Sequence, residues 1–191
     1  MKLILASQSS RRRELLAMIA PQPFTVQASE TDETLPEEID PARAVMLLAE
    51  KKARAVAGAQ EDADAVVIGA DTVVVIDGKI LGKPRSRSEC EKMLGLLSGR
   101  VHTVYTGVSV LAAGEAHSFF QSTEVEFYPL SGPEIAWYAS LEEPYDKAGA
   151  YGIQGRGAVL IKGIRGDYFN VMGLPVAKLW RTLRELGLKL E

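Results

Sequence analysis

The residues near the N-terminus with the clearest chemical potential are Ser7-Gln8-Ser9-Ser10-Arg11-Arg12-Arg13. They lead into a predicted helix over residues 10–19. A helix N-terminus carries partial positive charge, so arginines in its first turn are unfavourable unless an anion neutralises them. A bound phosphate would receive backbone N–H groups, hydroxyl groups and guanidinium groups together. Alternatively, Ser9 simply caps the helix and the arginines are solvated, and this pattern alone leaves both interpretations open.

Asp71 is a carboxylate within residues 65–76, which are otherwise almost wholly Ala, Val, Ile and Gly. Burial of a carboxylate is unfavourable unless it is hydrogen-bonded, paired or bound to a metal. The segment predicts two buried strands, Ala65–Ile68 and Thr72–Ile76, with Gly69-Ala70-Asp71 between them. Asp71 could be an ordinary turn residue, but a carboxylate held at a strand end favours a functional role.

Lys52 lies on the apolar face of a predicted helix over Ala42–Gly58, because it follows Leu48 by four residues and Ala49 by three. Its stem could pack against the core while the ammonium group reaches water. In the other interpretation the ammonium group enters a cleft and binds an anion there.

Two further segments could approach a ligand. Gly82-Lys83-Pro84 places a lysine on a stiff turn after the hairpin formed by Asp77-Gly78 and a short strand over residues 79–81. The segment Asp146–Gly157 is rich in glycine, which allows close approach of the backbone to a ligand. Its spacing matches neither a P-loop nor a dinucleotide-binding loop, so a P-loop nucleotidase is disfavoured.

The remaining periodicity predicts an α/β protein with a mixed sheet, because strands alternate with helices in the first half and hairpins dominate the middle. With 191 residues and no linker-like change of composition, we expect a single domain over residues 1–191. Further strands are expected at residues 2–6, 24–28, 103–111, 118–128 and 158–161, and further helices at 88–97, 131–141 and 175–186.

Composition limits the partners and the kinds of metal centre that we expect for this protein. The net charge of −3 disfavours nucleic acid and anionic membranes as partners. Cys90 is the only cysteine, and His102 and His117 are the only histidines, so a thiolate or histidine-rich metal centre is not expected. A catalytic metal would need oxygen ligands, which indicates Mg²⁺ or Mn²⁺. With no membrane-length apolar run and too short an N-terminal one for a signal peptide, we expect a cytoplasmic protein.

Several blocks along nearly the whole chain resemble the Maf family of nucleotide pyrophosphatases, within the ITPase-like superfamily. Their order and spacing are more specific than any single block. The blocks are residues 5–12 (LASQSSRR), 49–53 (AEKKA), 69–74 (GADTVV), 82–84 (GKP), 93–99 (MLGLLSG), 146–155 (DKAGAYGIQG) and 170–175 (NVMGLP). Ser10, where many relatives have proline, and the additional Arg13 depart from the pattern without removing a functional residue.

The resemblance implies hydrolysis of a nucleoside triphosphate to the monophosphate and pyrophosphate, with a divalent metal. It also implies an elongated three-layer α/β fold with a central mixed sheet and a cleft between two lobes, and often a homodimer. Asp71 matches the proton acceptor, and Glu33 with Asp71 would hold the metal. The positions that match the residues around the triphosphate are Ser7, Arg12, Lys52 and Lys83.

The resemblance also implies a subfamily. Members that prefer dTTP and UTP carry Arg, Thr and Gln at three specificity positions, matched here by Arg11, Thr72 and Gln154. The 7-methyl-GTP branch instead has tryptophan first and glutamate last. A carboxamide both donates and accepts, which suits a thymine or uracil edge, whereas a glutamate only accepts. Modified pyrimidine nucleotides, in a house-cleaning role, are compatible with the same pattern.

Two rival functions stay open at this stage. A phosphatase would release orthophosphate first, whereas attack at the α-phosphorus releases pyrophosphate. A nucleotide-binding regulator, linked to cell division by the family's association with septum formation, would have no need for Asp71 as a base.

Overall fold

The computed structural model describes residues 2–20, 23–29, 31–32, 34, 36, 38–60 and 64–188. Its strands are β1 (Leu3–Ala6), β2 (Thr25–Val26), β3 (Val66–Ile76), β4 (Lys79–Leu81), β5 (Val101–Ala112), β6 (Glu115–Phe127) and β7 (Ile161–Arg165). Its α-helices are α1 (Ser10–Ala17), α2 (Pro41–Ala57), α3 (Arg87–Leu97), α4 (Gly132–Ala139), α5 (Tyr168–Met172) and α6 (Val176–Glu185). Three 3₁₀ segments are η1 (Glu143–Asp146), η2 (Ala148–Ala150) and η3 (Gly155–Leu160).

The strands form one mixed sheet in the order β2-β1-β3-β5-β6-β7, with β4 paired to β3. Strand β1 is parallel to both β2 and β3, and Leu5 lies opposite Val26 on one side and Ile68 on the other. The pairs β3–β4 and β6–β7 are antiparallel. The predicted α/β class with a mixed sheet is therefore confirmed.

The chain divides into two compact units. Unit 1 comprises Met1–Asp71, Thr106–Gln121 and Gly173–Glu191, and unit 2 comprises Thr72–Tyr105 and Ser122–Met172. Strand β3 passes from unit 1 to unit 2 between Asp71 and Thr72. Each unit consists of segments that are separated in the sequence, so neither is completed by one continuous stretch.

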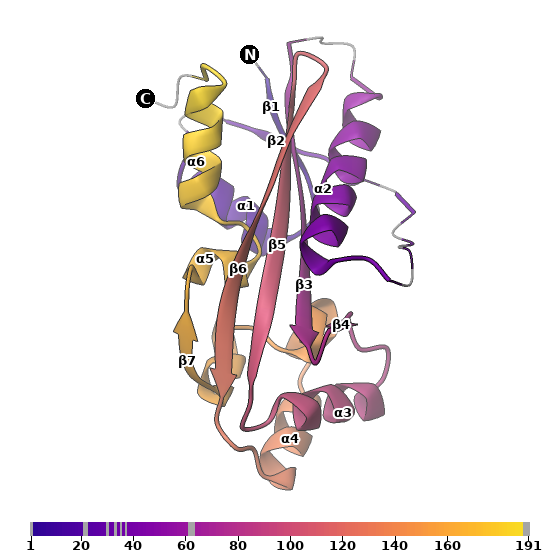
Figure 1. The fold of residues 1–191 in the computed structure, drawn as a ribbon, viewed down its shortest axis with the longest axis vertical. Helices are drawn as coiled ribbons and strands as arrows, with labels where there is room; N and C mark the ends of the chain where they lie inside the picture. The colour runs from indigo at the N-terminus through magenta and orange to yellow at the C-terminus, as the bar shows by residue number, and fades with distance from the viewer. Residues whose placement is uncertain are drawn as a thin grey trace. The chain divides into compact units, whose positions relative to one another are not determined.

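Unit 1 has helices on both faces of its part of the sheet: α2 lies on one side, and α1 and α6 lie on the other (Figure 1). The predicted apolar periodicity of α2 is confirmed. Its buried positions recur at three- and four-residue spacing over the length of the helix, and they are Ala42, Ala44, Val45, Leu48, Ala49, Ala53 and Val56.

Helix α2 contacts the sheet at two glycines. A Cβ atom added at Gly69 of β3 would lie 2.1 Å from the carbonyl oxygen of Ala49. At Gly107 of β5 an added Cβ would lie 2.3 Å from the carbonyl carbon of Val45. Any side chain at either position would therefore collide with helix backbone, and glycine allows the helix axis to lie unusually near the strands.

Unit 2 packs α3, α4 and the 3₁₀ segments against β3, β5 and β6 around an aromatic core (Figure 1). The rings of His102, Phe127 and Tyr151 meet edge to face, with centroids 4.7–5.3 Å apart. Burial lowers the pKa of His102 to about 4 and raises the pKa of the Cys90 thiol to about 11. Both groups are therefore neutral at pH 7 and belong to the core.

Three local predictions were wrong. Strand β3 is continuous through Asp71 rather than two strands joined by a turn, because the carboxylate finds its partner from within the strand. Residues 158–160 belong to η3, and β7 begins only at Ile161, because the pairing with β6 starts where Ile161 lies opposite Phe127. The strand expected at residues 24–28 is limited to β2, and helix α5 was not predicted.

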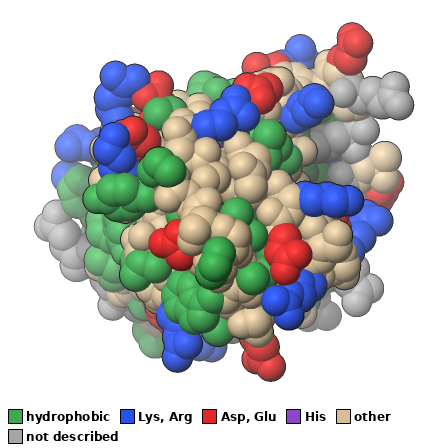
Figure 2. All heavy atoms as spheres, turned by 90° about the horizontal axis from the view of Figure 1, so that it is seen from below, with side chains coloured by type: hydrophobic (Ala, Val, Ile, Leu, Met, Phe, Trp, Pro, Cys, Tyr) green, Lys and Arg blue, Asp and Glu red, His purple; other side chains and the backbone are tan. Residues whose placement is uncertain are grey.

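No helix in the described part of the chain is long and apolar enough to cross a membrane. Figure 2 views the molecule from below Figure 1, and on this face lysine and arginine side chains are interspersed with aspartate and glutamate. This mixture is typical of an ordinary solvated protein surface.

The substitution Gly69→Ala should destabilise the protein by about 1–3 kcal/mol, because the new methyl group forces α2 away from β3. Gly95→Ala in α3 is the matched control. Nothing lies within 4 Å of a Cβ atom added there, and alanine is the better helix former. Urea unfolding should place Gly69→Ala below wild type and Gly95→Ala at or above it. Equal stability of the two variants would contradict this account of the helix position.

Candidate active site

Asp71 and Lys52 form a direct ion pair. The Nζ atom of Lys52 donates to Oδ1 of Asp71 at 2.6 Å, and both side chains are only 12 % exposed. The interpretation in which the Lys52 ammonium reaches water is therefore wrong. Lys52 points inward because it lies three residues after Ala49 and four after Leu48, on the buried face of α2, and Ala49 is the residue of that helix nearest to Gly69. The glycine contact thus positions the lysine beside the carboxylate two residues along β3.

The adjacent lysine behaves differently. Lys51 donates from Nζ to the backbone carbonyls of Asp32 and Thr34, at 3.4 and 3.5 Å. Two neighbouring lysines of one helix therefore have different partners. Lys51 binds the backbone of Asp32 and Thr34, and Lys52 binds the carboxylate in β3.

The N-terminal serines and arginines form a second cluster in unit 1. Ser9 caps α1 by accepting from the Arg12 N–H group at 3.4 Å, so the capping interpretation of Ser9 is confirmed. Ser7 is buried, and its hydroxyl oxygen accepts from the Ser9 N–H group and from Nη1 of Arg12, both at 3.3 Å. Ser7 and Arg12 are therefore in direct contact at the start of α1.

Arg12 also has a partner that sequence reasoning missed. Its Nε atom donates to the backbone carbonyl of Gly173 at 2.9 Å. The two residues are separated by 161 positions, and a carbonyl group has no sequence signature, so no local pattern could have indicated this bond. It fixes the guanidinium group against Ser7 at the start of α1.

The first turn of α1 contains no acidic residue, while Arg11 and Arg12 are partly buried there. The positive end of the helix and the arginines therefore add their charges in one place. Such an arrangement favours an anion as ligand.

The predicted residues of unit 2 are carried by three segments that meet at Gly149. Thr72 follows Asp71 directly in β3, whereas Lys83 and Gln154 are exposed on loops. The Gly149 N–H group donates to the carbonyl of Gly82 at 3.0 Å, beside Lys83. A Cβ atom at Gly149 would lie 2.8 Å from the Val74 side chain, and its φ of +69° also favours glycine. The glycine-rich segment is thereby held against both β3 and the lysine turn.

The predicted metal site rests on Asp71 and Glu33, and Glu33 lies outside the described residues. Among the residues that the structure describes, no group of three or more His, Cys, Asp or Glu side chains comes together. The assignment of Glu33 and of a divalent metal therefore stays a prediction.

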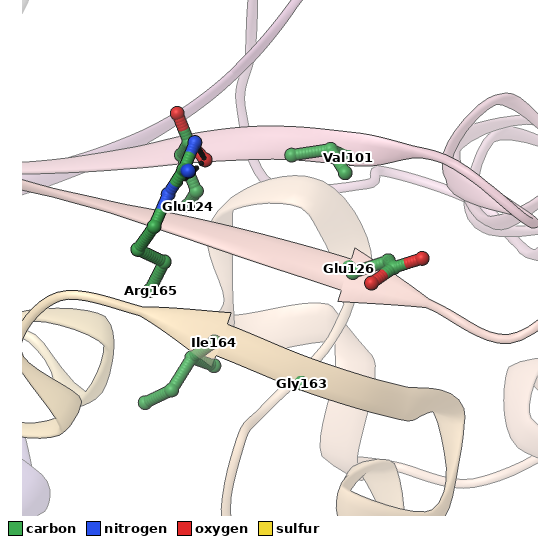
Figure 3. A pocket seen from close by; sticks show the side chains of 6 residues that line it. All are labelled: Val101, Glu124, Glu126, Gly163, Ile164 and Arg165. Atoms are coloured by element: carbon green, nitrogen blue, oxygen red, sulfur yellow. Dashed lines mark hydrogen bonds and ion pairs between the residues drawn. The ribbon is translucent and has the colours of Figure 1, made fainter.

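Unit 2 also has an open hollow of about 340 Å³ on the outer face of β5, β6 and β7 (Figure 3). It is lined by Val101, Glu124, Glu126, Gly163, Ile164 and Arg165. Glu124 pairs with Arg165, and Glu126 pairs with Lys162 at 2.7 Å. None of the predicted site residues lines this hollow, and exposed ion pairs of this kind contribute little to stability.

The sequence of this chain is similar to those of known proteins. The profile of the family described as "Maf-like protein" matches residues 2–186. The chain belongs to the Maf family.

Curated relatives extend this similarity over almost their whole length. The chain is 52% identical over 188 residues to a protein of Bacillus velezensis named "dTTP/UTP pyrophosphatase", covering 98% of each chain. Proteins of the same name from Bacillus cytotoxicus and Bacillus cereus are 49% and 46% identical. The alignments cover 96% of this chain and 95% of the former, and 98% of this chain and 96% of the latter.

Arg12→Ala should lower the free energy of unfolding by about 1–2 kcal/mol, since it removes charge-assisted hydrogen bonds to Gly173 and Ser7. Arg13→Ala is the matched control because Arg13 is the exposed neighbour in the same turn, and its loss should change stability by less than about 0.5 kcal/mol. Urea unfolding of both variants measures the difference. If Arg13→Ala were the more damaging change, the structural role given to Arg12 would be incorrect.

Proposed function

We propose that this protein is a nucleoside triphosphate pyrophosphatase that hydrolyses dTTP and UTP to the monophosphate and pyrophosphate. The observation that carries the proposal is the buried ion pair between Lys52 and Asp71, because it holds one carboxylate in a fixed position within unit 1. Family membership and the names of the full-length relatives support the same reaction class.

In the proposed reaction, Asp71 accepts a proton from a water molecule as the water oxygen attacks the α-phosphorus. The bond between the α-phosphorus and the oxygen that bridges to the β-phosphate breaks, and pyrophosphate leaves with the electron pair. Lys52 donates to Oδ1 of Asp71 and so fixes the orientation of the carboxylate. Ser7, Arg12, Lys52 and Lys83 bind phosphate oxygens and offset the charge that develops on them.

We propose a divalent cation as cofactor. Asp71 offers a carboxylate that is largely withdrawn from solvent, and carboxylate oxygens suit Mg²⁺ or Mn²⁺. Asp71 and Glu33 are the residues proposed to hold the ion. When bound, such an ion neutralises triphosphate charge and polarises a phosphoryl oxygen.

Arg11, Thr72 and Gln154 are proposed to select the base. The carboxamide of Gln154 can accept from the N3–H group of thymine or uracil and donate to a neighbouring carbonyl. A guanine edge would leave the carboxamide of Gln154 without its matching donor and acceptor, and that mismatch disfavours the wrong substrate. Modified pyrimidine nucleotides with the same edge fit this account.

We further propose that residues 1–191 act as one functional domain, as a homodimer and in the cytoplasm. The sole cysteine, Cys90, is buried and unbridged, which is compatible with a reducing compartment. A role in septum formation would be an additional property of the same domain.

Asp71→Asn should lower kcat by at least about 100-fold while leaving the fold intact, because the amide has similar shape but cannot take the proton. Asp77→Asn is the control, since Asp77 is an exposed turn residue paired with Arg100. The measurement is pyrophosphate release from dTTP and UTP with Mg²⁺, Mn²⁺ and Co²⁺, with circular dichroism to monitor folding.

Undiminished turnover by Asp71→Asn would remove Asp71 as the base. Orthophosphate as the first product would instead indicate a phosphatase. No pyrophosphate release from any nucleotide with any of the three metals would favour a nucleotide-binding regulator.

Gln154→Glu should lower kcat/KM for dTTP and UTP by about 100-fold or more, because a glutamate cannot donate to the pyrimidine carbonyl. Activity on guanine nucleotides should fall less, so the ratio within each enzyme is an internal control. An unchanged ratio of dTTP to dGTP activity would exclude Gln154 from base selection.

A further inference from the structure

The segment that carries Gln154 is held by side chains rather than by a strand. Residues 152–157 form a turn and the beginning of η3. Two positions before Gln154, the Gly152 N–H group donates to the hydroxyl oxygen of Tyr138 at 3.2 Å. Tyr138 lies in α4 and is completely buried, so its position is set by the core of unit 2.

Glu143 binds the other side of Gln154. One of its carboxylate oxygens accepts from the Gly157 N–H group and the other from the Arg156 N–H group, each at 3.0 Å. The Tyr138 hydroxyl donates, at 2.8 Å, to the same Glu143 oxygen that accepts from the Gly157 N–H group. Tyr138 and Glu143 therefore form one connected unit, here called the Tyr–Glu clamp, which fixes the backbone on both sides of Gln154.

Two glycines allow the clamp to lie directly against the loop. A Cβ atom at Gly155 would lie 2.7 Å from a carboxylate oxygen of Glu143, and its φ of +68° also favours glycine. A Cβ atom at Gly157 would lie 2.6 Å from the Tyr138 hydroxyl oxygen. The loop therefore has glycine at the two positions where a side chain would collide with Glu143 or Tyr138.

The charge states of the clamp are complementary at neutral pH. Burial acts to raise the pKa of Glu143, but the N–H groups of Arg156 and Gly157 and the nearby Tyr138 and Lys147 lower it below its usual range. Burial raises the pKa of Tyr138. A charged acceptor thus receives hydrogen bonds from a neutral phenol and two amides, which is the stronger, charge-assisted kind of hydrogen bond.

We propose that Tyr138 and Glu143 are positioning residues for base selection: they fix the backbone around Gln154 so that its carboxamide reaches the pyrimidine edge from one backbone position. This inference rests on the proposed function and adds to it the residues that make Gln154 selective. Gln154 itself is exposed, and a free loop would let its amide adopt many orientations. The clamp removes the backbone part of that freedom before substrate binds.

The test compares Glu143→Gln and Tyr138→Phe with wild type. Glutamine keeps the shape of Glu143 but offers a single acceptor oxygen, so at least one loop amide loses its partner. Glu142→Gln is the matched control, an exposed neighbour with the same chemical change. Two readouts are used: hydrogen exchange at the amides of residues 152, 156 and 157, and the preference for dTTP over dGTP.

In both clamp variants the three amides should exchange about tenfold faster or more, while exchange in β3 and β5 is unchanged. The dTTP preference should fall by about tenfold or more, through KM rather than kcat, and Glu142→Gln should match wild type. The same loss of preference should appear in the Kd values of non-hydrolysable α,β-imido analogues of dTTP and dGTP, measured with Mg²⁺.

A double-variant cycle separates positioning from general damage. In a Gln154→Ala background, Glu143→Gln should lower the dTTP preference no further, because its effect acts through Gln154. An additional loss there, unchanged exchange at the loop amides, or faster exchange with undiminished preference would each overturn the inference. If wild type releases no pyrophosphate, the proposed function fails, and the Kd ratios still decide the role of the clamp.

Discussion

Helix α2 and the sheet touch backbone to backbone, and the candidate active site depends on that contact. At Gly69 and Gly107 the absence of a side chain brings the helix down onto β3 and β5. Lys52, between the alanines that make the contact, then reaches Asp71 at 2.6 Å with little exposure to water. A larger residue at Gly69 would push α2 away from β3 and so move Lys52 away from Asp71.

The sequence alone indicated much of the fold and the identity of the central pair. The three- and four-residue spacing of apolar residues predicted α2 and placed Lys52 on its inner face, and the apolar surroundings of Asp71 marked it as exceptional. What the pattern could not supply was the partnership between them. Because the carboxylate is neutralised from the helix above, β3 continues through Asp71 instead of turning there.

The interactions that escaped prediction share a physical cause. Arg12 donates a hydrogen bond to the Gly173 carbonyl, and Glu143 accepts hydrogen bonds from two loop N–H groups. In each case one partner is a backbone group of a kind that nearly every residue possesses. Residue type and spacing report side-chain chemistry and periodic burial, whereas a bond from a side chain to a distant backbone group is fixed only by the folded chain.

The discontinuity of unit 1 has a consequence for biosynthesis. Chains emerge from the ribosome N-terminus first, and domains tend to fold as units. The serine–arginine cluster is made well before the Gly173 carbonyl that anchors Arg12 and before helix α6, although all three belong to unit 1. A nascent chain therefore lacks the bond between Arg12 and the Gly173 carbonyl until residue 173 has been synthesised.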